Sequence, residues 1–122
     1  MEQSFSDRVA AAMQVVTALS PHEAAALQEA EEVIFVDPRP AKAIAASTGI
    51  IRDSLNIELH SIGGRELPPE LDNQSVHIVT ACQGGPMGAV AAHEFKKVGF
   101  PRVNYVEGGT QAWLDAGYPT VK

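Results

Sequence analysis

Residues 76–99 have the sequence VHIVTACQGGPMGAVAAHEFKKVG, and this stretch decides the fold. Residues 76–81 are rich in apolar and β-branched side chains, which predicts a buried strand. Residues 88–98 carry apolar side chains at helical spacing, and Gly99 is suited to end that helix. A strand, a short glycine-containing loop and a helix in this order form the repeating unit of a parallel α/β sheet.

The same alternation occurs along the rest of the chain. Ser20, Pro21 and Glu23 have the spacing of a capped helix start, which predicts a helix to about Ala30. The other expected elements are strands at 33–36, 55–57 and 103–106, helices at 41–46 and 110–116, and a loop at 62–69. Strands that alternate with helices predict a parallel sheet covered on both faces.

Length and composition limit the possible classes of protein. With 122 residues, 45% of them hydrophobic, the chain fits one domain with a real core. The formal charge of −6 disfavours nucleic acid as a partner, because that binding depends on clustered Lys and Arg. No apolar run approaches the roughly 18 residues of a membrane span, and residues 9–13 lack the features of a signal peptide, so we expect no membrane association and a cytoplasmic location.

The single cysteine, Cys82, lies between the predicted strand and helix of residues 76–99. It cannot form an internal disulfide, and the four histidines have no metal-ligand spacing, so no metal or cofactor is expected. Gly84 and Gly85 can adopt positive φ, which lets the loop curl and turn backbone N–H groups inward. Such a loop at a helix N-terminus stabilises a thiolate, the reactive form of cysteine. A lone free cysteine is more often a small buried hydrophobe, but the position of Cys82 favours a chemical role.

Several blocks of the chain resemble the rhodanese-like, or sulfurtransferase, family from about Val16 to Lys122. The blocks are LSPHE at 19–23, VDPR at 36–39, GIIRDSLNI at 49–57, VTACQGG at 79–85, GF at 99–100, VEGGTQAW at 106–113 and AGYP at 116–119. The resemblance implies one rhodanese-like domain over 16–122, with a central parallel five-stranded sheet and helices on both faces. Residues 1–15 are then an N-terminal helical extension.

The resemblance also implies roles for particular residues. Cys82 would be the nucleophile that carries a sulfane sulfur as a persulfide. The substrate would be bound by the loop backbone amides of Gln83, Gly84, Gly85, Pro86, Met87 and Gly88, and the loop would be supported by Asp37 and Arg39. The donor would be thiosulfate or a persulfide, and the acceptor an external thiol, a protein or cyanide, because the chain holds no second cysteine.

Departures from the family pattern modify these expectations. Met87 stands where many relatives have Arg or another polar residue, so the loop lacks a charge-assisted hydrogen bond worth about 1.5–3 kcal/mol. We therefore expect weak thiosulfate binding and a preference for a less anionic donor. Ile50 and Asp53 replace residues of the family's second block and leave the shape of that loop open. Ala43 replaces an acidic partner of Arg39, which leaves open the alternative that Arg39 faces the site.

Two other functions compete with sulfur transfer. A Cys-dependent phosphatase or arsenate reductase also uses a cysteine in an anion-binding loop, but phosphatase loops need an arginine at the sixth position after the cysteine, where this chain has Gly88. A non-catalytic module that binds a protein partner through the same scaffold is the second alternative, because a fold does not fix a function.

Overall fold

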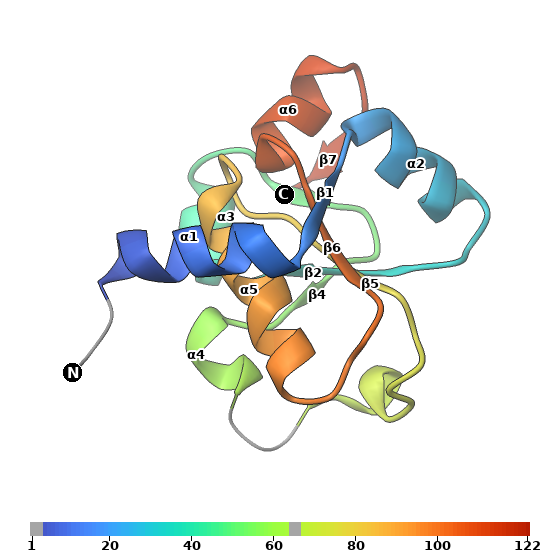
Figure 1. The fold of residues 1–122 in the computed structure, drawn as a ribbon. Coiled ribbons are helices and arrows are strands. Elements are labelled where there is room, and N and C mark those ends of the chain that lie inside the picture. The colour runs from blue at the N-terminus through green and yellow to red at the C-terminus, as the bar shows by residue number, and fades with distance from the viewer. Residues whose placement is uncertain (1–3, 64–66) are drawn as a thin grey trace.

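Five parallel strands form the centre of the protein in the order β1-β6-β5-β2-β4 (Figure 1). The structure is a computed structural model that describes residues 4–63 and 67–122. The strands are β1 (Thr17–Leu19), β2 (Ile34–Asp37), β4 (Leu55–Asn56), β5 (Ile78–Thr80) and β6 (Val103–Val106). The predicted five-stranded parallel sheet is therefore confirmed.

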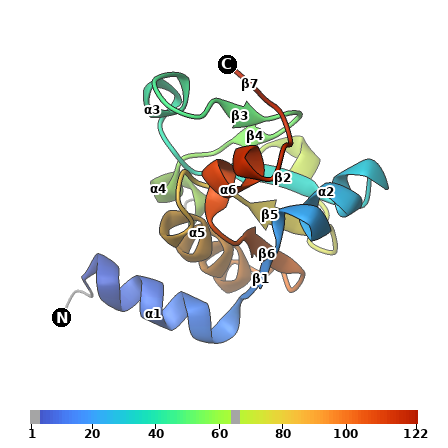
Figure 2. The same ribbon diagram turned by 90° about the horizontal axis from the view of Figure 1, so that it is seen from above.

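Helices cover both faces of this sheet, as predicted (Figure 2). They are α1 (Phe5–Val15), α2 (Pro21–Glu29), α3 (Ala41–Ala45), α4 (Leu59–Ile62), α5 (Pro86–Lys97) and α6 (Gly109–Asp115), with a short 3₁₀ helix at Pro69–Leu71. Helices α1, α4 and α5 lie on one face, and α2 and α6 on the other. No helix among the described residues is long and apolar enough to cross a membrane.

The core has two halves, one on each face of the sheet. Ile78 packs on the side of Phe95 in α5, whereas its neighbour Val79 packs on the side of Trp113 in α6. Successive side chains of a strand point to opposite faces, so an apolar strand such as β5 contributes to both halves. This is why residues 76–81 lack a polar face.

Several local predictions hold and others need correction. Ser20 and Glu23 form the predicted capping box of α2, and α1 has a similar box at Ser4. Helix α5 begins at Pro86, two residues before the predicted start, because proline is well suited to the first helical position. The predicted loop at 62–69 contains the end of α4, and its residues 64–66 lie outside the described residues.

The sequence pattern did not predict a small second sheet. β3 (Ile50–Ile51) pairs antiparallel with β7 (Thr120–Val121), and strands of two residues have no periodicity that could reveal them. Asp53, which follows β3, has φ +65°, so it takes the left-handed conformation natural to the glycine of the family's block. Aspartate tolerates that conformation better than most residues.

The register of the sheet places three loops at one edge. Thr80 of β5 lies opposite Val36 of β2 and Tyr105 of β6. All three strands are parallel, so the loops that follow them leave the same edge of the sheet. After β2 the chain continues to β4 on one side of the sheet, and after β5 it continues to β6 on the other side, so the two connections diverge between β2 and β5. Ligands of open α/β sheets bind at such a switch point, beyond the carboxyl ends of the strands.

Candidate active site

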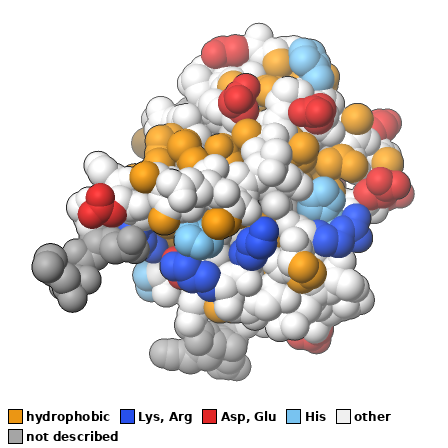
Figure 3. Space-filling model, viewed as in Figure 1, with side chains coloured by type: hydrophobic (Ala, Val, Ile, Leu, Met, Phe, Trp, Pro, Cys, Tyr) orange, Lys and Arg blue, Asp and Glu red, His pale blue; other side chains and the backbone are white. Residues whose placement is uncertain are grey.

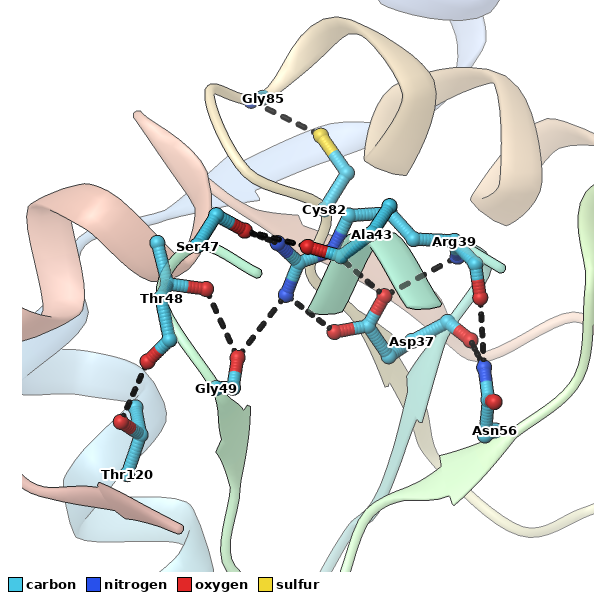
Figure 4. A network of polar contacts seen from close by, with 10 residues as sticks. All are labelled: Asp37, Arg39, Ala43, Ser47, Thr48, Gly49, Asn56, Cys82, Gly85 and Thr120. Carbon is cyan, nitrogen blue, oxygen red and sulfur yellow. Dashed lines mark hydrogen bonds and ion pairs between the residues drawn. The ribbon is translucent and has the colours of Figure 1, made fainter. Parts of the chain in front are cut away.

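Cys82 lies at this switch point, two residues after the end of β5. Its side chain is only 3% exposed, and its sulfur accepts a hydrogen bond from the backbone N–H of Gly85 at 3.0 Å (Figure 4). Cys82 also lines a pocket of about 360 Å³. The thiol is thus buried against a backbone donor and still borders a cavity that a small molecule can enter.

Two glycines shape the loop in different ways. Gly85 has φ +116° and is the residue before the first turn of α5, so it alone makes the sharp bend. Gly84 does not have positive φ, which corrects the expectation that both glycines would use that freedom. A Cβ on Gly84 would meet no atom within 4 Å, so its small size is not required by packing.

Backbone N–H groups surround the bend without partners. Those of Gln83, Gly84, Met87 and Gly88 donate no hydrogen bond to any atom of the residues that the structure describes. Pro86 has no N–H, so it cannot contribute the amide expected of it and instead starts α5. Unpaired donors at a helix N-terminus form an environment that favours an anion.

The start of α6 holds the Cys82 loop from behind. The N–H of Thr110 donates to the Cys82 carbonyl at 2.7 Å, and the N–H of Gln111 donates to the Gln83 carbonyl at 3.0 Å. In a planar trans peptide the C=O and the following N–H point in opposite directions, so the N–H groups of Gln83 and Gly84 point away from α6. Gly108 and Gly109, which precede Thr110, therefore begin a turn that orients the Cys82 loop.

Asp37 and Arg39 form a buried ion pair beside the loop, 2% and 4% exposed. Arg39 donates from Nε to Oδ1 of Asp37 at 3.0 Å and from Nη2 to Oδ2 at 2.7 Å. Its guanidinium also donates to Ser47 Oγ and the Gly49 carbonyl, and the Asn56 amide donates to the carbonyls of Asp37 and Arg39 (Figure 4). These bonds connect the loops after β2 and α3 with Asn56 of β4. Arg39 lines the pocket beside Cys82, but its charge is paired with Asp37.

The pocket beside Cys82 has a mostly apolar rim. Its lining residues are Phe5, Arg39, Pro40, Ala43, Cys82, Gln83, Gly84, Pro86 and Met87. Phe5 was not predicted, because it comes from α1, far from Cys82 in the sequence, and no local pattern links the two. Within the described residues, no group of three His, Cys, Asp or Glu side chains could hold a metal ion.

A comparison with family models agrees with this arrangement. The model of the rhodanese-like domain matches residues 20–116. The chain belongs to the rhodanese-like domain family. A curated sulfurtransferase of Allochromatium vinosum is 33% identical over 97 residues, which cover 78% of this chain and 84% of that protein. This rhodanese-like domain is thus of the sulfurtransferase type.

Solved structures share the fold. A Rhodopseudomonas palustris protein of unknown function, described as a possible tyrosine phosphatase, has a TM-score of 0.87 and 26% identity, and the match covers 99% of this chain and 96% of that one. The human single-domain sulfurtransferase TSTD1 has a TM-score of 0.71 and 21% identity, covering 82% of this chain and 96% of that one. At that identity the second likeness concerns the fold alone.

Thr110 offers a test of packing in this rhodanese-like domain. Its hydroxyl is buried and has no hydrogen-bond partner among residues 4–63 and 67–122, although its backbone N–H donates to the Cys82 carbonyl. Because an unpaired buried polar group costs about 1–3 kcal/mol, we expect Thr110→Val to be neutral or to raise the free energy of unfolding by about 1 kcal/mol. Urea unfolding measures the change. A loss of more than about 1 kcal/mol would mean that the hydroxyl is hydrogen-bonded in solution.

Proposed function

We propose that the protein transfers sulfane sulfur by carrying it as a persulfide on Cys82. The observation that carries this proposal is the backbone around the sulfur: the Gly85 N–H lies 3.0 Å from Sγ, and four neighbouring N–H groups have no partner among the described residues. Such donors stabilise a thiolate before transfer and a persulfide anion after it. A structural cysteine would need none of them.

The reaction proceeds in two displacement steps. The Cys82 thiolate attacks the outer sulfur of the donor, the bond between that sulfur and the rest of the donor breaks, and the leaving group takes the electron pair. A thiolate or cyanide then attacks the outer sulfur of the Cys82 persulfide and releases the cysteine as a thiolate. Splitting one transfer into two displacements is covalent nucleophilic catalysis. Because Cys82 is the chain's single cysteine, the acceptor comes from outside.

Thiosulfate is a poor fit among possible donors. It carries two negative charges, and Arg39, the one cation among the described residues that line the pocket, already pairs with Asp37. Backbone N–H groups alone must then bind the sulfonate. We expect thiosulfate to charge Cys82 slowly and only at high concentration.

A phosphatase is the second candidate, because the similar Rhodopseudomonas palustris protein is described as a possible tyrosine phosphatase. Phosphoryl transfer needs a cation that clamps the equatorial oxygens. Gly88 occupies the position where a phosphatase loop has its arginine, and Arg39 is held by Asp37 at 2.7 Å. This arrangement supports sulfur transfer over phosphoryl transfer.

Intact-mass measurement tests the proposal directly. After incubation with excess thiosulfate or an organic persulfide, we expect the protein to gain the mass of one sulfur atom, and cyanide should remove it with formation of thiocyanate. The Cys82→Ser variant should gain nothing, since a hydroxyl does not form a persulfide. If the wild-type protein takes up sulfur from none of these donors, the result would support the alternative that the domain is a non-catalytic binding module. Hydrolysis of an aryl phosphate that is lost in Cys82→Ser would instead support a phosphatase.

A further inference from the structure

Helix α1, which lies outside the residues that the family model matches, contributes Phe5 to the lining of the Cys82 pocket. Phe5, in the first turn of α1, lines this pocket together with Pro40 and Met87. The Phe5 side chain remains 45% exposed, a high value for a large apolar side chain. An aromatic ring that is half open to a reactive pocket is available to contact a ligand there.

Several contacts hold α1, the helix that carries Phe5, against α5. Ser4 caps the helix directly before Phe5, and Ala12 is fully buried against the core. Arg8 pairs with Glu94 of α5 at 3.5 Å, and the Lys96 ammonium donates to the Val15 carbonyl at 3.0 Å. Helix α1 is thus fastened to α5 (Figure 1), and Pro86 and Met87 in the first turn of α5 line the same pocket as Cys82. The helix that carries Phe5 is therefore held beside the pocket.

Hydrophobic and basic side chains occupy different parts of the face drawn in Figure 3. Hydrophobic side chains gather between α1 and α6, whereas Lys and Arg side chains lie in a lower band across the molecule. Among the described residues that line the pocket, Arg39 is the only charged one, and its charge is matched by Asp37. The pocket therefore offers a donor an apolar wall and backbone N–H groups, with no unpaired positive charge.

We propose that Phe5, with Met87, selects sulfane-sulfur donors that bear an apolar substituent and a single negative charge. This inference rests on the proposed function. In a thiosulfonate, for example, the Cys82 thiolate attacks the terminal sulfur, the bond from that sulfur to the sulfonyl group breaks, and the sulfinate leaves with the electron pair. The substituent of the sulfinate lies against Phe5 and Met87, while the terminal sulfur meets the N–H groups of the loop.

Three donors with the same reacting bond test this inference: thiosulfate, methanethiosulfonate and benzenethiosulfonate. The readout is the second-order rate constant for sulfur uptake at Cys82, followed by intact mass without an acceptor. The wild type should charge fastest with benzenethiosulfonate and slowest with thiosulfate. In Phe5→Ala, the ratio of the benzene to the methane donor should fall roughly tenfold, because an apolar contact in a specificity pocket is lost. Intrinsic donor reactivity cancels, since the same two donors are compared in both proteins.

Two variants serve as controls. Phe5→Leu keeps an apolar side chain and should retain most of the wild-type ratio. Met13→Ala removes another exposed apolar side chain of α1 that does not line the pocket, and it should leave the ratio unchanged. An unchanged ratio in Phe5→Ala, or an equal fall in Met13→Ala, would overturn the role of Phe5 while sulfur uptake itself stands. Absence of uptake from all three donors in the wild type would overturn this inference, and the proposed function would fall with it only if an organic persulfide also delivered no sulfur to Cys82.

Discussion

Gly109→Ala is expected to lower the rate of sulfur uptake at Cys82 by about 100-fold, because it displaces the loop that holds the sulfur. A Cβ at this position would lie 2.7 Å from the carbonyl oxygens of both Cys82 and Gln83. These carbonyls accept the hydrogen bonds of Thr110 and Gln111, so they cannot move without breaking the contact with α6. The N–H groups on the opposite sides of the same peptides would move with them. Intact mass after a short incubation with benzenethiosulfonate measures the rate.

Gly117→Ala is the matched control for this prediction. Gly117 has φ +98° and Gly109 has φ +67°, so alanine meets an unfavourable backbone conformation at both sites, at a cost of about 1–2 kcal/mol. A Cβ at Gly117, however, would meet no atom within 4 Å. The Gly117→Ala variant should therefore be less stable than the wild type but take up sulfur at the wild-type rate. Equal loss of rate in both variants would show that general destabilisation, rather than the displaced loop, lowers the rate.

Local patterns in the sequence were sufficient to predict the centre of the fold. The apolar run before Cys82 and the helical spacing after it each lie within one element, so the strand β5 and the helix α5 follow from neighbouring residues alone. Parallel strands then place their following loops at one edge, which brings Cys82 to the switch point of the sheet. The position of the candidate nucleophile was therefore predictable from its place between two periodic segments.

Contacts between distant segments were not predictable in the same way. Phe5 reaches the pocket only because α1 packs along α5, and a short amphipathic segment does not reveal where it will dock. The hydrogen bonds from Thr110 and Gln111 to the loop depend on the sheet placing β5 beside β6. Two consecutive glycines, Gly108 and Gly109, indicate an unusual backbone conformation. Their close approach to Cys82 could not be predicted, because it depends on how the strands pair in the folded sheet.

Asp37→Asn is expected to destabilise the protein by about 3–5 kcal/mol. The substitution keeps the size of the side chain but removes the charge that matches Arg39, and it leaves a guanidinium buried without a counter-ion. Since domains of this size unfold with about 5–15 kcal/mol, the change removes a large part of the total. We expect a fall in Tm of about 10–20 °C, measured by calorimetry at neutral pH.

The exposed pair of Arg52 and Asp53 supplies the comparison. These side chains are 63% and 85% exposed and their charged atoms lie 3.7 Å apart, so water already solvates both. Asparagine tolerates the left-handed backbone of Asp53, and Asp53→Asn should therefore change stability by less than about 0.5 kcal/mol. If Asp37→Asn lowered the free energy of unfolding as little as Asp53→Asn does, the hydrogen bonds to Ser47 and to the Gly49 carbonyl would suffice to hold Arg39. The guanidinium would then rely on neutral acceptors rather than on Asp37, and the loop beside Cys82 would not depend on the ion pair.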